Sequence, residues 1–72
     1  MTRTDLIAAA ARYALTVEIV DDEVHVTGSG VRMVEFRYEA IEAGAEYLGT
    51  VRAPAAPLGT PVLDLPRTVR FA

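Results

Sequence analysis

His25 is the single histidine of this 72-residue chain and the first candidate for acid–base chemistry. A sheet that places it between Glu18 and Glu35 would favour the charged imidazolium. These three side chains also offer ligands for a divalent cation, but the chain has no second histidine and no cysteine to complete an ordinary transition-metal site. The pattern is more typical of a polar row on an exposed sheet face. We therefore predict no catalytic residue, no metal site and no cofactor.

Ser29 is the only serine, and it lies between Gly28 and Gly30. The nucleophile turn of hydrolases needs glycine two residues to either side of the serine. Thr27 and Val31 occupy those positions here. The segment is better explained as a turn between two elements.

The chain carries a mildly acidic net charge of −3, with several carboxylates close together. A surface rich in carboxylates could imitate a phosphate backbone and inhibit a DNA-handling enzyme, although a solvated face is the simpler explanation. Direct nucleic-acid binding is not expected, because no basic patch is present to neutralise phosphates. The acidic residues in question are Asp21, Asp22, Glu23, Glu35, Glu39, Glu42 and Glu46.

A helix is predicted over Thr2–Leu15. Thr2 and Asp5 have the spacing of a capping box, and the alanine run from residue 8 to 11 has the highest helix propensity. Leu6, Ala10 and Tyr13 share one face, which we assign to the core.

A hairpin is predicted next, with strands at residues 16–20 and 23–27 joined by a turn at Asp21–Asp22. Turn length and hydrophobic pattern agree on one register, which is what fixes a hairpin. The register pairs Val17 with Val26, Glu18 with His25 and Ile19 with Val24.

Residues 31–48 fit two structures. Alternation of apolar and charged side chains favours a third strand at Arg32–Tyr38, followed by a helix at Glu39–Leu48 that stops at Gly49. In this strand Val34 would pair with Val26, Phe36 with Val24, Glu35 with His25 and Arg37 with Glu23. Helical spacing of the apolar residues instead permits one long helix over Val31–Leu48. We prefer the strand, which gives an α+β fold of two layers in the order α-β-β-β-α.

The C-terminal part is extended and apolar, because four prolines forbid a regular helix. We divide the chain into a compact domain at residues 1–52 and a tail at residues 53–72. The tail is predicted to bind a partner as an added strand, through Leu63, Leu65, Val69 and Phe71. The alternative is that it folds back on the edge of its own hairpin. Under the first reading, removal of residues 61–72 leaves the core folded. The helix face with Glu39, Glu42 and Glu46 is the second candidate surface.

Composition points to a small globular domain. Hydrophobic residues make up 51% and cysteine is absent, so a domain of this size gains stability most readily from self-association. Seven arginines with no lysine, and twelve alanines, indicate a GC-rich gene of bacterial or phage origin. We expect a cytoplasmic homo-oligomer with no membrane contact, acting as a non-catalytic protein–protein interaction domain.

Part of the chain resembles a known family, the head–tail joining protein W of lambda-like phages. Met1-Thr2-Arg3, the stretch from Ala8 to Leu15, and Val34-Glu35-Phe36 before a helix carry the resemblance, which covers about a quarter of the chain. The family's basic tail is absent here. The resemblance implies a virion connector whose tail contacts other virion proteins.

Overall fold

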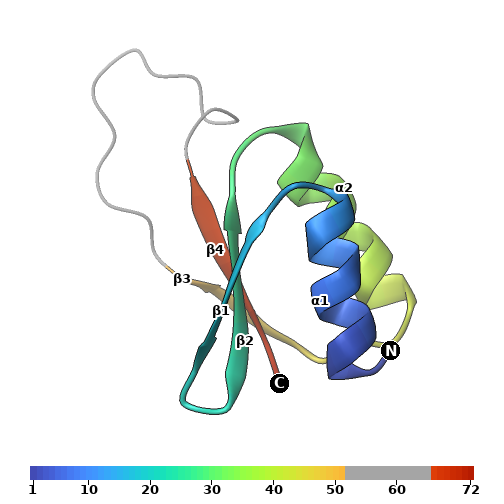
Figure 1. The fold of residues 1–72 in the computed structure, drawn as a ribbon. Coiled ribbons are helices and arrows are strands. Elements are labelled where there is room, and N and C mark those ends of the chain that lie inside the picture. Colours follow the sequence, from blue (N-terminus) through green and yellow to red (C-terminus); the bar gives the residue numbers. More distant parts are fainter. Residues whose placement is uncertain (52–65) are drawn as a thin grey trace.

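The computed structural model describes residues 1–51 and 66–72 (Figure 1). Within these ranges the chain forms two helices and a four-stranded antiparallel sheet, so the α+β class is confirmed. Along the chain the elements are α1 (Arg3–Arg12), β1 (Thr16–Val20), β2 (Glu23–Gly28), α2 (Val31–Glu42), β3 (Tyr47–Val51) and β4 (Arg67–Phe71).

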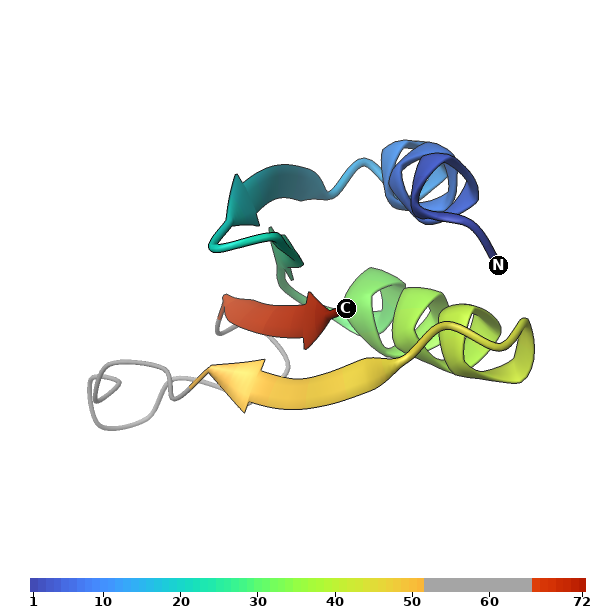
Figure 2. The same ribbon diagram turned by 90° about the horizontal axis from the view of Figure 1, so that it is seen from below.

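The strands lie in the order β1-β2-β4-β3. Figure 2 shows both helices on the same face of the sheet, α1 toward the β1 edge and α2 toward the β3 edge. The core fills the space between the two layers. Its buried side chains are Leu6, Ala9, Ala10, Leu15, Val24, Val26, Met33, Phe36, Ala40, Val69 and Phe71.

Helix α1 has the predicted capping box. Thr2 Oγ1 accepts a hydrogen bond from the Asp5 amide at 3.1 Å, and Asp5 Oδ2 accepts one from the Thr2 amide at 3.2 Å. Hydrogen bonding of the Asp5 carboxylate to the Thr2 side chain, and then to the Thr2 amide, lowers the pKa of this carboxyl. Leu6 and Ala10 are buried and Tyr13 is partly buried, as the helical spacing predicts.

The hairpin of β1 and β2 has the predicted register, with Val17 opposite Val26 and Ile19 opposite Val24. Asp21 and Asp22 adopt φ angles of 50° and 67°. Positive φ at both central residues is typical of the two-residue turn whose twist matches that of the strands.

The preferred strand at Arg32–Tyr38 is wrong, because these residues belong to α2. Met33, Phe36 and Ala40 are the buried residues of this helix, at helical spacing, while Tyr38 is 67% exposed. The alternative of a helix from Val31 begins at the right residue but extends too far. Helix α2 ends at Glu42, and Gly44 follows with a φ of 92°, a left-handed conformation that favours glycine.

The predicted helix at Glu39–Leu48 is also wrong in its second half. Tyr47–Val51 form β3, an edge strand that pairs with β4. Gly49 lies inside this strand, at a register shift between Tyr47 and Gly49, and does not stop a helix.

Strand β4 is the largest correction to the predicted fold. It lies between β2 and β3, with Val69 opposite Val26 and Phe71 opposite Val24. These are the positions that the sequence pattern assigned to Val34 and Phe36. The C-terminal strand therefore completes the domain's own sheet, which is the folding-back alternative, and the division between residues 1–52 and 53–72 does not separate a core from a free tail.

Phe71 is the centre of an aromatic cluster. Its ring lies 5.9 Å from that of Phe36 and 5.6 Å from that of Tyr47, between centroids. Phe36 in turn contacts Tyr13 edge-on at 6.2 Å. The cluster joins α1, α2, β3 and β4 in one core.

Gly28 at the end of β2 allows a close approach of Leu15. A Cβ atom at position 28 would lie 2.2 Å from Leu15 Cδ2. The glycine therefore has a packing role, which supports the structural interpretation of the Gly28-Ser29-Gly30 segment.

Candidate functional site

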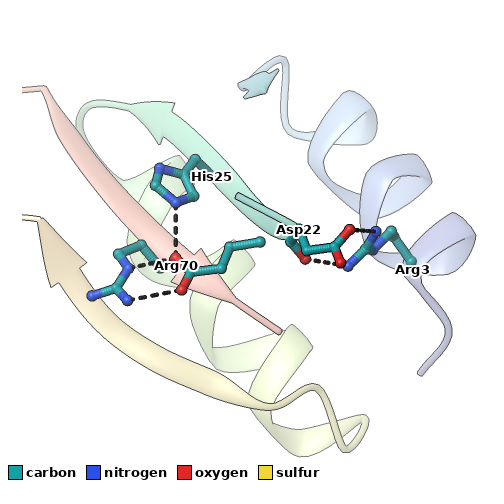
Figure 3. A network of polar contacts seen from close by, with 5 residues as sticks. Arg3, Asp22, His25 and Arg70 are labelled. Carbon is teal, nitrogen blue, oxygen red and sulfur yellow. Dashed lines mark hydrogen bonds and ion pairs between the residues drawn. The ribbon is translucent and has the colours of Figure 1, made fainter. Parts of the chain in front are cut away.

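A polar network occupies the face of the sheet opposite the helices (Figure 3). Glu23 accepts two hydrogen bonds from the Arg70 guanidinium, from Nε at 2.9 Å and Nη2 at 3.1 Å. His25 Nε2 lies 3.0 Å from the same carboxylate. Nearby, Arg3 binds Asp22 and so ties the start of α1 to the hairpin turn.

Only one of the partners that were predicted for His25 and Glu23 is found in the structure. Glu18 is the cross-strand neighbour of His25 as expected. Glu35 and Arg37, however, lie on α2 in the other layer, so neither faces His25 or Glu23. Because β4 occupies the position of the expected third strand, Arg70 lies opposite His25, where Glu35 was predicted. Its side chain binds Glu23, the partner that was predicted for Arg37.

The network lowers the pKa of Glu23. Hydrogen bonds from Arg70 and then from His25 stabilise the carboxylate, and they lower the pKa of Glu23 from 4.5 to about 2. The stabilisation of the fold by the Glu23 carboxylate is therefore complete above about pH 4.5 and is lost as the pH falls toward 2.

We expect Glu23→Gln to lower the melting temperature at pH 7 and to have progressively less effect below about pH 4.5, because the unfolded wild-type carboxyl takes up its proton there. Thermal unfolding of both proteins, followed by circular dichroism from pH 7 to pH 2, measures the difference. A difference that stays constant over this range would show that the carboxylate charge is not responsible.

A groove of about 400 Å³ lies elsewhere, between α2 and the edge strand β3. Its lining residues are Arg37, Tyr38, Ile41, Glu42 and Tyr47, and none belongs to the network around Glu23. Two of its apolar side chains are open to solvent, since Tyr38 is 67% exposed and Ile41 is 45% exposed. The groove is therefore an apolar surface with one positive and one negative side chain.

The groove has a fixed floor. The Tyr47 ring packs on buried Phe71, its hydroxyl hydrogen-bonds to Thr50, and Arg37 Cζ lies 5.9 Å from the ring centroid. A guanidinium at this distance from an aromatic ring is attracted to its face. These three contacts restrain the Tyr47 ring, which we call the floor of the groove.

The two edges of the sheet differ in charge. Edge strand β1 carries Glu18 at its centre, whereas Tyr47–Val51 of β3 contain no charged residue. Within residues 1–51 and 66–72, β3 pairs only with β4, so its other side presents unpaired backbone groups. Proteins commonly place charges on an exposed edge to prevent association, and β3 lacks this protection.

The predicted partner-binding residues of the tail are not at this surface. Val69 and Phe71 are buried in the core, at 1% and 0% exposure, and cannot contact a partner in the folded domain. Leu63 and Leu65 lie outside the described residues.

The three glutamates of the predicted acidic helix face make different contacts in the structure. Glu39 forms an ion pair with Arg12 of α1 at 3.1 Å. Glu42 lines the groove. Glu46 lies beyond the end of α2, and its carbonyl accepts a hydrogen bond from the Ala72 amide at 3.0 Å. Glu39 and Glu42 thus lie one turn apart on α2, and Glu46 lies outside the helix.

Sequence reasoning did not single out Tyr38, Ile41 and Tyr47. The signal available was the spacing of Tyr38 and Ile41, which share a helix face but do not align with the buried Met33 and Phe36. An apolar pair off the core-facing side of a helix indicates a surface open to a partner.

Among residues 1–51 and 66–72, no group of three or more His, Asp or Glu side chains is placed to hold a metal ion. Neither α1 nor α2 is long and apolar enough to cross a membrane. Comparison with protein families, curated proteins and solved structures finds no match for this chain.

Proposed function

We propose that this protein is a non-catalytic protein–protein interaction domain, whose binding surface is the α2–β3 groove together with the free edge of β3. The observation that carries the proposal is the groove itself, an exposed apolar surface with a fixed aromatic floor beside an uncharged strand edge.

The β3 edge and the groove correspond to the two parts of β-strand addition, a common mode of peptide binding. The backbone of an edge strand can pair with an extended segment, and a neighbouring pocket can then select one of its side chains. Tyr38, Ile41 and Tyr47 offer apolar area for that side chain, while Arg37 and Glu42 offer hydrogen bonds at the rim. Tyrosine and arginine are also residue types that often dominate binding energy.

The resemblance to head–tail joining protein W supplies one class of partner for this surface, a virion protein. A connector works by binding other proteins without chemistry, which agrees with a binding surface of this kind. The acidic mimic receives less support, because Glu39 and Glu23 are paired with Arg12 and Arg70. The enzyme using His25 also receives less support, because His25 binds Glu23 and does not line the groove.

The test uses random peptides displayed on phage, selected against the purified domain. Selected peptides are expected to bind the wild type and to lose affinity by roughly tenfold or more when Ile41→Glu places a charge in the groove. Fluorescence polarisation measures the affinity.

Ile7→Glu is the matched control, since Ile7 is also an exposed helix residue but lies on α1. Its affinity for the peptides should equal that of the wild type. Equal loss in both variants, or failure of a monomeric wild type to select any peptide, would remove the groove as the binding surface.

A further inference from the structure

We infer that the partner that fits this groove is a second copy of the same chain, bound about a two-fold axis next to β3. The two β3 edges then run antiparallel beside each other, and α2 lies antiparallel to the α2 of the second copy. This inference rests on the proposed function and names the partner of the same surface.

The charge order along α2 favours a second copy as the partner. Arg37 precedes and Glu42 follows the exposed pair Tyr38 and Ile41. When a second α2 lies antiparallel, the Arg37 end of one helix is level with the Glu42 end of the other. The apolar pairs then meet in the middle, with opposite charges at both ends, so the surface is complementary to itself as a two-fold interface requires.

The difference between the two sheet edges places the two-fold axis beside β3. A two-fold axis beside β1 would bring Glu18 close to Glu18 of the second copy, and like charges across an edge repel. Strand β3 has no such charge. Pairing of β3 with the β1 edge of another copy would leave free edges and continue without limit, whereas β3 against β3 closes as a dimer.

The small size of the domain also favours self-association. A chain of 72 residues buries a smaller fraction of its surface than a larger domain does, and 51% of its residues are hydrophobic. Among the described residues, most of the large hydrophobic side chains that are exposed belong to α2 and β3, namely Val31, Tyr38, Ile41, Leu48 and Val51, while Met1, Ile7 and Ile19 lie elsewhere. A second copy covers this side of the molecule.

The experiment exchanges the charges at the two ends of the groove. Arg37→Glu makes both ends acidic, and Glu42→Arg makes both ends basic. Each variant alone is expected to dimerise at least about tenfold more weakly than the wild type, because symmetry repeats the repulsion at both ends. An equimolar mixture of the two variants is complementary again and should form a heterodimer, which native mass spectrometry distinguishes by its mass.

Sedimentation of the full chain supplies the remaining controls. The wild type is expected to reach twice the 7.8 kDa chain mass, Ile41→Glu to remain a monomer, and Ile7→Glu to behave as the wild type. A dimer that survives Ile41→Glu, or a mixture that fails to form a heterodimer, would overturn the inference. A wild type that stays monomeric would also overturn it. If the wild type is monomeric but selected peptides bind it and do not bind Ile41→Glu, the proposed function still stands. If the wild type is monomeric and no peptide binds it, the inference and the proposed function both fail.

Discussion

Deletion of residues 67–72 is expected to abolish cooperative folding. The deletion removes β4, which lies between β2 and β3 and pairs with both. It also removes Val69 and Phe71, which are at most 1% exposed. Loss of one buried phenylalanine side chain alone typically costs about 3–5 kcal/mol, and a small domain has little more than this in total. The truncated chain should show no thermal transition by circular dichroism and poor dispersion of its amide NMR signals.

A chain that lacks only Ala72 is the control. Ala72 is exposed and contributes one backbone hydrogen bond, to Glu46, so its removal should leave the transition close to that of the full chain. A cooperative transition in the protein without residues 67–72 would mean that α1, α2 and the β1–β2 hairpin form a stable unit without the C-terminal strand. That result would restore the division into a core and a separable tail.

The sequence predicted the elements whose determinants are local. The capping box of Thr2 and Asp5 needs only neighbouring residues, and it forms as expected. The hairpin is similar, because its register follows from a two-residue turn and from the alternation of residues on either side. In both cases the partners are close along the chain.

The sequence did not reveal which segment lies beside β2. The pattern correctly required an apolar strand opposite Val24 and Val26, but two segments could fill that place. Phe71 and Val69 fill it, although each lies more than forty residues along the chain from its partner in β2. Alternation within Arg67–Phe71 was visible, yet the prolines before it suggested a tail, and no local signal says which edge a distant strand will join.

The candidate groove depends on the same long-range pairing. Tyr38 and Ile41 belong to one helix face, and their spacing alone predicts that they lie together. Tyr47 joins them only because β3 pairs with β4 and packs its ring on Phe71. The side chains of the groove could thus be predicted in part, but its floor could not.

Residues 31–38 show how two periodicities can coexist in one segment. Val34, Phe36 and Tyr38 alternate with charged residues as in a strand, while Met33, Phe36 and Ala40 have helical spacing. Phe36 belongs to both sets, so it carries no information about the choice. Tyr38 and Met33 distinguish a strand from a helix, because a strand would bury Tyr38 beside Phe36 and would expose Met33.

Substitution at Phe36 and Tyr38 is therefore expected to give very different results. Phe36 is fully buried and contacts the rings of Tyr13 and Phe71, so Phe36→Ala should lower the free energy of unfolding by about 3–5 kcal/mol. Tyr38→Ala removes a side chain that is 67% exposed and should change it by less than about 1 kcal/mol. Urea unfolding measures both values, at low protein concentration so that linked self-association contributes least. In the alternating strand the two side chains would share a buried face and their losses would be comparable. Comparable losses would thus contradict helix α2, and with it the groove that α2 forms with β3.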